Sequence, residues 1–426
     1  MSPSEYSRYC GIILDHLAKF YPTMRHEAAG GAFKRPFIVA GGGYEHCMWD
    51  WDSYFASVSL FCLMRQTNAP KQTFDSMVEA MQGNILNFLD LQLANGAIPP
   101  SFYPGSDGFY EKSIAKWEPN VHKPVLAQFV ELVSEQVGDY GWIAPRLRDI
   151  ARLHAHYDER YRHAATGLYM WRSGAVIGVD NDPCTFGRPK CSSANIYLNS
   201  LMAKEFDAMA RVMERVGDAA EAARYREKRA DLAASIQRYC WDRRDRFFYS
   251  VDLQCETERD IPWLNSGLGV FWPCLPMRIR VWTGFMPLWA GIATKDQAAD
   301  MVRLHLDDRE ALGCDYGIRT LAANEPMYNV ERTSNPSNWL GPVWMISNYM
   351  VFRGLVDYGF KAEAEAFREK VVLLLGRDIE ENGAMHEYYV PEPGKGVMNL
   401  GFMNWNYLAA NMIETDCAQC AEGCTK

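Results

Sequence analysis

Residues 195–216, with the sequence NIYLNSLMAKEFDAMARVMERV, decide how this chain folds. Apolar side chains recur there at intervals of three and four residues, which is typical of the buried face of an amphipathic helix: Leu198, Leu201, Met202, Met209 and Val212. A single glycine, Gly217, separates this helix from a second helical pattern over residues 218–240, rich in alanine, Arg and Glu. Two helices joined by so short a turn form an antiparallel hairpin.

Further helical patterns occur along the chain. Residues 1–23 predict an amphipathic helix, and two more are expected from Ser337 or Pro342 to Val356 and over residues 361–375. The segments HYDERYRHAATGLYMW (156–171) and RYCWDRRDRFFYSVD (238–252) share one pattern, in which a helix end is followed by a polar turn and a short aromatic run. Repeated hairpins of this kind predict a closed all-α toroid with irregular loops and short strands around a pocket. The alternative is an irregular helical protein whose repeats are coincidental.

The chain has no evident linker, so we expect a single domain over residues 1–412 and a tail over residues 413–426. The tail carries Cys417, Cys420 and Cys424, which are spaced like metal ligands. No fourth ligand lies nearby, and terminal segments are often loosely ordered. We therefore expect a disordered or loosely docked tail, and no metal.

Composition limits the classes of function. The net charge of −9 disfavours nucleic acid and anionic membranes as partners, and a hydrophobic content of 48% permits a large core. With no apparent export signal and no membrane-length apolar run, we expect a cytoplasmic protein with reduced cysteines. The chain lacks the G-x-S-x-G, P-loop, dinucleotide-binding and H-E-x-x-H motifs, so no cofactor is expected. Aromatic residues make up 13% of the chain, which suits either sugar stacking or a core.

Two segments carry a carboxylate among glycines and aromatics: SGAVIGVDNDP (173–183) with Asp180, and GAMHEYYVPEPGKG (383–396) with Glu387. An enzyme that cleaves a glycosidic bond needs one carboxyl group to give a proton and one to take a proton from water. Asp182 lies two residues after Asp180, so in an extended segment both carboxyl groups share one side and one keeps its proton more easily. A turn that Asp182 holds before Pro183 is an equally good interpretation.

Other aromatic segments suit sugar binding. In WDWDSYF (49–55), an indole covers an apolar ring face and a carboxylate accepts hydroxyl hydrogen bonds, although Asp52 or Ser53 as a helix cap explains the same residues. In KPVLAQ (123–128), Lys123 or Gln128 is a candidate to face a ligand. The substrate-binding residues expected from all these segments are Trp49, Trp51, Asp52, Tyr54, Lys123, Gln128, Asn181, Trp339, Gly341, Trp344 and Trp405.

Several motifs carry a resemblance to a known family: WDWDSYF, NGAIPP, KPVLAQ, GVDNDP, FMPLWAGIAT, GIRTLAANEPMYN, NWLGPVW, HEYY and NWN, in that order from about residue 40 to residue 410. Together they resemble the trehalase-like (α/α)6 glycosidases, above all glycoside hydrolase family 63 with its compact mannosylglycerate and glucosylglycerate hydrolases. The resemblance implies a single (α/α)6 barrel.

The resemblance also implies an inverting mechanism with Asp180 as general acid and Glu387 as general base. Trp51 and Asp52 match residues that hold the nonreducing sugar, and Trp339, Trp344 and Trp405 match aromatics that wall the pocket. Two positions depart from the family pattern. Asp182 stands where Ser or Thr is usual, and Leu340 stands where W-R-G-P supplies an Arg.

The expected function is therefore hydrolysis of a small α-glucoside or α-mannoside by an inverting, exo-acting α-glycosidase. Candidate substrates are glucosylglycerate, mannosylglycerate, a trehalose-like sugar or a short α-gluco-oligosaccharide. An inverting pair predicts carboxyl groups about 6.5–9.5 Å apart. One alternative is a sugar epimerase, isomerase or lyase on the same barrel, with His386 and Tyr388 as acid and base. Another is a sugar-binding protein that has lost catalysis, which the presence of both carboxylates disfavours.

Overall fold

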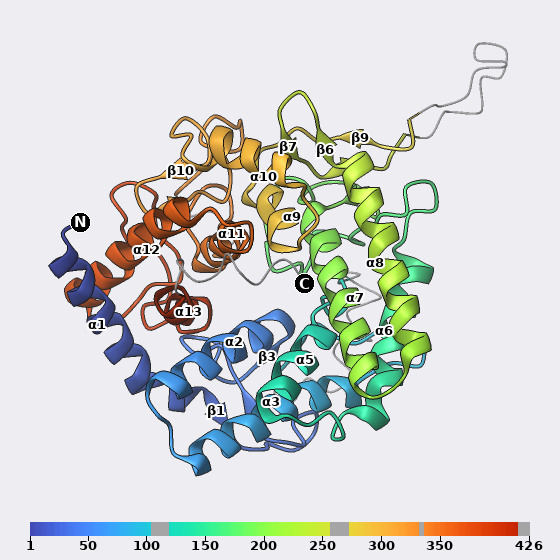
Figure 1. Ribbon diagram of the computed structural model, residues 1–426, viewed down its shortest axis with the longest axis horizontal. Helices are drawn as coiled ribbons and strands as arrows, with labels where there is room; N and C mark the ends of the chain where they lie inside the picture. The colour runs from blue at the N-terminus through green and yellow to red at the C-terminus, as the bar shows by residue number, and fades with distance from the viewer. Residues whose placement is uncertain (104–118, 256–271, 332–335, 416–426) are drawn as a thin grey trace.

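The computed structural model describes residues 1–103, 119–255, 272–331 and 336–415. Helices form two concentric rings (Figure 1). The inner ring closes on itself, because each of its helices contacts the next and the last contacts the first: α2 (Asp50–Gln66), α5 (Leu126–Val137), α7 (Ile196–Arg215), α9 (Met286–Trp289), α11 (Met345–Asp357) and α13 (Leu408–Glu414). The outer helices are α1 (Pro3–Phe20), α3 (Lys71–Asp90), α6 (Leu147–Arg160), α8 (Ala219–Tyr239), α10 (Lys295–Met301) and α12 (Lys361–Asn382).

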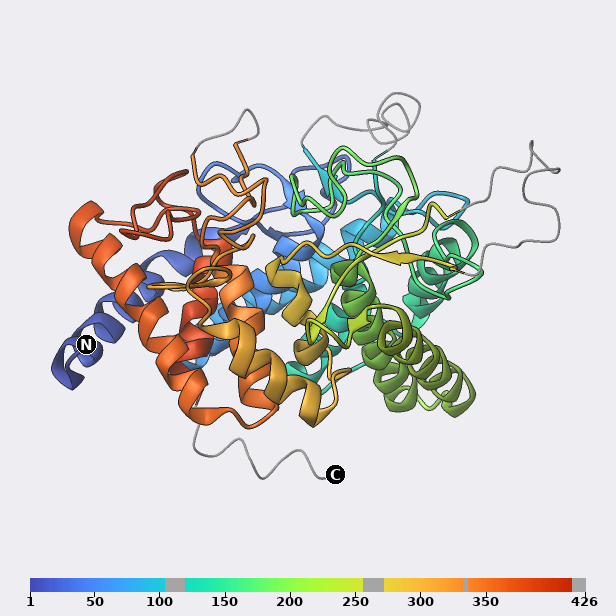
Figure 2. The same ribbon diagram turned by 90° about the horizontal axis from the view of Figure 1, so that it is seen from above.

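Short strands and single helical turns connect the helices. All the strand pairs are antiparallel: β1 (Arg25–His26) with β2 (Phe37–Ile38), β3 (Met48–Trp49) with β4 (Ser101–Phe102), β6 (Trp241–Asp242) with β7 (Phe247–Phe248), and β10 (Gly313–Cys314) with β11 (Gly317–Ile318). A three-stranded sheet has the order β5 (Ser193–Ala194), β8 (Val251–Asp252) and β9 (Leu275–Pro276). The turns are Tyr21–Met24, Ala144–Arg146, Trp282–Phe285, Val302–Leu306 and Asn404–Tyr407. Figure 2 shows the short strands and most of the long loops gathered on one side of the helical rings.

The predicted hairpin at residues 195–240 is confirmed as α7 and α8. The side chain of Asn195 accepts a hydrogen bond from the backbone N–H of Tyr197 and so caps α7, and Asp218 caps α8 in the same way. The expected apolar face of α7 is completely buried, because this helix belongs to the inner ring. In α8 only Ala222, Tyr225, Leu232 and Ile236 are buried, as expected for an outer helix with one face in solvent.

The two similar segments at 156–171 and 238–252 do share a structure. The first follows α6 with a bridge between Arg162 and Tyr169, and the second follows α8 with the β6–β7 hairpin, in which Trp241 pairs with Phe248. The repetition read from the sequence is therefore a real repeat of helix and tight turn.

Two predicted helix ends were wrong. The helix expected from residue 337 or 342 begins only at Met345, because Val343 is drawn into an extended bridge with Tyr389. The helix expected to end at residue 375 runs on to Asn382. It stops at Gly383, whose φ of 77° is the left-handed conformation typical of a helix C-terminus.

The last described helix, α13, reaches Glu414 and thus runs slightly past the expected domain boundary at residue 412. The three tail cysteines at positions 417, 420 and 424 lie outside the described residues. Within the described part of the chain, no helix is long and apolar enough to cross a membrane.

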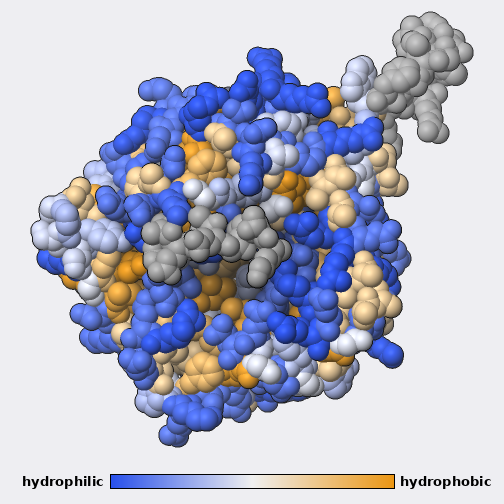
Figure 3. Space-filling view, viewed as in Figure 1, coloured by the Kyte–Doolittle hydropathy of each residue, from blue (hydrophilic) through white to orange (hydrophobic). Residues whose placement is uncertain are grey.

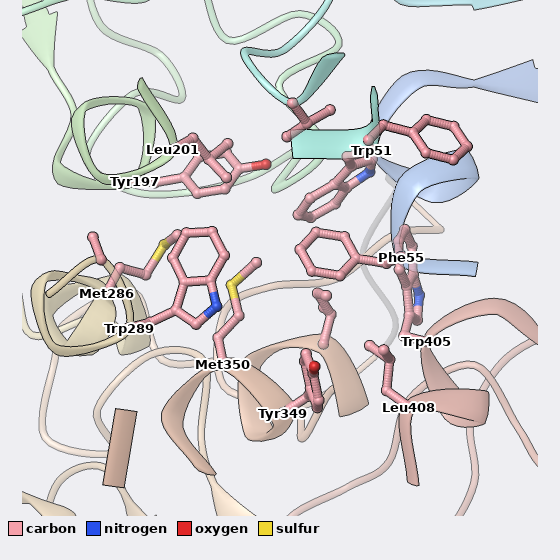
Figure 4. Close-up of a cluster of buried hydrophobic side chains, with 14 of the residues drawn as sticks. Trp51, Phe55, Tyr197, Leu201, Met286, Trp289, Tyr349, Met350, Trp405 and Leu408 are labelled. Carbon is pink, nitrogen blue, oxygen red and sulfur yellow. The ribbon is translucent and has the colours of Figure 1, made fainter. Parts of the chain in front are cut away.

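The middle of the inner ring is packed with apolar side chains. Figure 4 shows Trp51, Phe55, Tyr197, Trp289 and Tyr349 pointing from different inner helices toward this shared interior. In the space-filling view, hydrophilic side chains cover most of the face, and apolar residues are visible near its centre (Figure 3). The interior is therefore a core and not an open channel.

Candidate active site

A pocket of about 290 Å³ collects side chains from loops that are far apart in the sequence. That volume is close to the lower limit of about 300 Å³ for small-molecule sites. Three carboxylates line it, together with a wall of aromatic rings. The lining residues are Tyr44, Trp49, Trp51, Asp52, Val176, Gly178, Asp180, Ser337, Trp339, Trp344, Glu387, Phe402 and Trp405.

Asp180 lies in a turn that packs directly on two buried side chains. Gly178 has a φ of 88°, and a Cβ added there would lie 2.7 Å from the Trp51 ring and 2.9 Å from the Lys123 stem. Only glycine fits this approach. Burial raises the pKa of the Asp180 carboxyl, while the Lys123 charge and a hydrogen bond from Ser337 oppose that rise. A raised pKa is what a general acid requires.

Of the two interpretations left open for Asp182, the structure contradicts the one in which its carboxyl group lies on the same side as that of Asp180. The segment turns, with the Asp182 N–H bonded to the Val179 carbonyl, and the Asp182 side chain is buried. Its Oδ2 accepts hydrogen bonds from Asn195 Nδ2 at 2.6 Å and Thr185 Oγ1 at 3.2 Å. Burial raises its pKa to about 6. The turn interpretation is the one that the structure supports, and the raised pKa of Asp180 comes from burial.

Glu387 lines the same pocket, on the segment that follows α12, and it is only 5% exposed. Its Oε2 accepts a 2.5 Å hydrogen bond from Asn399 Nδ2, and the Tyr44 hydroxyl lies 3.5 Å from Oε1. Burial is the main reason that its pKa rises to about 7, with a further contribution from the charge of Asp180. The two carboxylates predicted to form the catalytic pair therefore line one pocket, and the charge of Asp180 contributes to the raised pKa of Glu387.

Asp52 is the third carboxylate of the pocket. Its Oδ1 accepts a 2.6 Å hydrogen bond from Asn404 Nδ2. Burial raises its pKa well above the ordinary range, although the Lys123 charge opposes this. Its position beside the aromatic wall suits a group that binds sugar hydroxyls.

The aromatic wall is a set of stacked rings. Trp339 and Trp344 lie 4.0 Å apart and almost parallel, and Trp344 stacks on Tyr388 at 4.8 Å. Trp405 packs 5.0 Å from Trp51. All the tryptophans expected at the site line the pocket, which offers flat apolar faces suited to a sugar ring.

Five residues of the expected binding set lie outside the pocket lining, which corrects the expectation that they face the ligand. Lys123 is 1% exposed, and its Nζ is 2.9 Å from Asp50 Oδ1 in a buried ion pair. Gln128 Nε2 donates to the backbone carbonyls of Pro124 and Leu201 inside the protein. Tyr54 instead packs against Phe55 and Phe129.

Asn181 and Gly341 complete that group. The Asn181 side chain binds the backbone N–H of Trp339 and the side chain of Asn338. Gly341 has a φ of 136°, and an added Cβ would lie 2.4 Å from the Tyr328 ring. Both residues hold the 338–344 segment in place. Leu340 belongs to a small apolar cluster with Cys184, Met277, Val281 and Leu321 and does not line the pocket.

Several pocket residues had not been identified as site residues from the sequence: Tyr44, Val176, Gly178, Ser337 and Phe402, together with Asn399 behind Glu387. The signal that could have found them was their position beside glycines in the loops that carry the motifs, such as GGGY at 41–44.

The alternative acid–base pair of His386 and Tyr388 is not assembled in the pocket. His386 Nδ1 lies 3.0 Å from the Asp378 carboxylate, beside a separate cavity of about 330 Å³, and the Tyr388 hydroxyl donates to the Pro336 carbonyl. Among the described residues, no group of three or more His, Cys, Asp or Glu side chains is placed to hold a metal ion.

The closed double ring of helices and the aromatic pocket lined by three carboxylates are those of a glycoside hydrolase of the (α/α)6 type. The chain belongs to the family of mannosylglycerate hydrolase MGH1-like glycoside hydrolases, whose family model matches residues 44–406.

Individual relatives agree with this family. Mannosylglycerate hydrolase MGH1 from Selaginella moellendorffii is 33% identical over 125 residues, which is 29% of this chain and only 22% of that protein's length. The crystal structure of the GH63 mannosylglycerate hydrolase from Thermus thermophilus in complex with glucose superposes with a TM-score of 0.65 at 19% identity, over 91% of this chain and 97% of that one. Neutral trehalase Nth1 from Saccharomyces cerevisiae has a TM-score of 0.60 at 16% identity, over 94% and 80% of the two chains. These two structures share the fold.

Proposed function

We propose that the protein is an inverting, exo-acting α-glycosidase that removes one glucosyl or mannosyl residue from a small α-glycoside. The observation that carries this proposal is that Asp180 and Glu387, from remote parts of the chain, line the same aromatic pocket. Asp180 gives its proton to the glycosidic oxygen as the bond to the anomeric carbon breaks. Glu387 takes a proton from the water that attacks the same carbon from the opposite face.

The environments of the two carboxyl groups support these roles. Burial raises the pKa of Glu387 to about 7, and the hydrogen bond that Asn399 donates opposes this rise, so the ionised form that a base needs prevails above about pH 7. Burial favours the protonated form of Asp180, which an acid needs. Asp52 and the stacked tryptophans hold the sugar between the two groups. No cofactor enters this scheme, and the only partner that it requires is the small sugar substrate.

The substrate class follows from the relatives and from the lining. Mannosylglycerate hydrolases are among the similar proteins, so mannosylglycerate and glucosylglycerate are leading candidates. The described lining residues include no Lys or Arg to bind a glycerate carboxylate. Neutral α-linked disaccharides such as trehalose are therefore equally relevant test substrates.

The test is hydrolysis of this substrate panel by the full chain and by two variants, Asp180→Asn and Glu387→Gln. Each variant is expected to lose about 10²–10⁴-fold in kcat, because general acid and general base catalysis each contribute that much. Glu381→Gln, in the separate cavity beside His386, is the matched control and is expected to keep wild-type activity. Wild-type turnover in either pocket variant, or a single rearranged sugar as product, contradicts the proposal.

A further inference from the structure

One segment, residues 336–344, contacts both catalytic loops. On the side of the acid, Asn181 Oδ1 accepts a 2.7 Å hydrogen bond from the Trp339 N–H, and Asn181 Nδ2 donates to Asn338 Oδ1 at 3.2 Å. Asn181 directly follows Asp180, is 4% exposed and does not line the pocket. The oxygen and the nitrogen of the Asn181 carboxamide therefore both bind this segment and attach the turn of Asp180 to it.

The same segment holds the residues that follow Glu387. Val343 and Tyr389 exchange backbone hydrogen bonds of 2.8 and 3.0 Å. The Tyr388 hydroxyl donates to the Pro336 carbonyl at 3.0 Å, and the Tyr388 ring stacks on Trp344. Glu387 is thus attached to this segment through Tyr388 and Tyr389, the two residues that follow it.

Contacts within the segment make it stiff. Trp344 Nε1 donates to the Asn338 carbonyl at 2.7 Å, and the Leu340 N–H donates to Asn338 Oδ1 at 3.0 Å. The Trp339 and Trp344 rings lie 4.0 Å apart with only 9° between their planes. The parts of residues 336–344 that bind the two catalytic loops are therefore held rigidly relative to each other.

We propose that Asn181 is the positioning residue of the general acid, and that residues 336–344 form a bracket that fixes the separation of Asp180 from Glu387. This inference rests on the proposed function. An inverting pair has to leave room for one water and no more, and misplacing a catalytic group by about 1 Å costs about 100-fold in rate. Removing the hydrogen bonds between Asn181 and the bracket should therefore slow proton donation by Asp180 more than it slows the attack of water.

The experiment compares two substrates that differ in their need for an acid. An α-linked disaccharide cleaved by the wild type needs protonation of its leaving oxygen, whereas the matching α-glycosyl fluoride loses fluoride without it. Asn181→Ala is expected to lose about 100-fold in kcat on the disaccharide, with KM within a few fold, and to stay within a few fold of wild type on the fluoride. Asp180→Asn should show the same selectivity, and Glu387→Gln should lose both activities.

Asn181→Asp is a second variant of nearly the same shape, which replaces the Nδ2 donor toward Asn338 by an acceptor; it is expected to show the same selective loss. Asn324→Ala is the control, because Asn324 is exposed and neither it nor its partner Arg280 lines the pocket; it should leave both activities unchanged. The result applies to an Asn181 variant that keeps the wild-type unfolding temperature. If its kcat falls equally on both substrates, or on neither, the positioning role is overturned. If the wild type hydrolyses neither substrate, the proposed function fails and the inference fails with it.

Discussion

At the scale of single residues, the site is built by burying carboxylates that water would otherwise stabilise. Asp52, Asp180 and Glu387 all have raised pKa values, and burial is the first cause in each case. The sequence identified all three, because carboxylates among glycines and aromatics are unusual. For Asp182 the sequence left an extended segment and a turn equally open, and only the structure shows the turn.

Burial of Glu387 should make folding depend on pH. Its folded pKa of about 7 lies above its ordinary value of 4.5, so the folded state holds this proton more tightly than the unfolded state does. The resulting stability is present in full below pH 4.5 and is lost as the pH rises through about 7. Glu387→Gln removes this titration and should stabilise the protein at pH 8 by about 2–4 kcal/mol relative to wild type.

The check is denaturant unfolding of both proteins at about pH 4.5 and about pH 8. The gain should shrink toward zero at the lower pH, and the exposed Glu365→Gln should show no gain at either pH. A Glu387→Gln variant less stable than wild type at the higher pH contradicts this description of the site.

At the scale of elements, the helix patterns were read well from the sequence, whereas Asp52 or Ser53 as a helix cap is contradicted, because α2 begins at Asp50 after Trp49 with no side-chain cap. The α7–α8 hairpin was predicted within one residue, because its single connecting glycine and its apolar spacing agree. The start of α11 was missed, since only a long-range bridge from Val343 to Tyr389 shows that residues 338–344 stay extended. Local sequence carries no signal for such a pairing.

The cap of α7 also anchors the acid's loop. Asn195 caps the helix through Oδ1 and donates through Nδ2 to the buried Asp182 carboxylate. Asn195→Ala should therefore cost more than an ordinary cap: about 1 kcal/mol for the helix end and about 1–3 kcal/mol for the hydrogen bond that the buried Asp182 carboxylate loses at about pH 8, where Thr185 still donates to it. Asp218→Ala, which removes the exposed cap of α8, is the matched control at about 1 kcal/mol. Equal costs for the two variants in urea unfolding would show that Asn195 is only a helix cap.

At the scale of the whole molecule, the ring brings distant loops together at one side and fills its own centre. Residues of the pocket come from before α2, before α7, before α11 and after α12, so the sequence order of the motifs predicted which loops meet. It did not predict which residues within a motif turn inward. The KPVLAQ motif contains Lys123 and Gln128 but none of the residues that line the pocket. Asp50 and carbonyl groups inside the protein bind the polar groups of these two side chains.

Because the centre of the helical ring is filled with side chains, we expect the protein to cleave only the terminal sugar of a substrate. The aromatic interior around Trp51 and Phe55 lies where a through-channel would have to run, so a long substrate has no exit on the far side (Figure 4). With a short α-linked oligosaccharide, the protein should release single sugars from the nonreducing end. A substrate methylated on the terminal sugar should resist cleavage. Early appearance of fragments that are shorter than the substrate by two or more sugars, without an equal amount of the single sugar, would contradict exo action when the products are followed by chromatography.

The most direct test of the central claim is the configuration of the first product. The claim is that Asp180 and Glu387 act on opposite faces of one anomeric carbon, with a water between Glu387 and the sugar. The substrate for this test is an α-glycoside whose leaving group is not itself a sugar, such as the α-glycosyl fluoride or an α-glycosyl glycerate. Proton NMR in the first minutes of its hydrolysis should show the β-anomer appearing first and the α-anomer growing later by mutarotation. First appearance of the α-anomer would mean retention of configuration, and Glu387 would then not be the base that activates a water on the opposite face of the sugar.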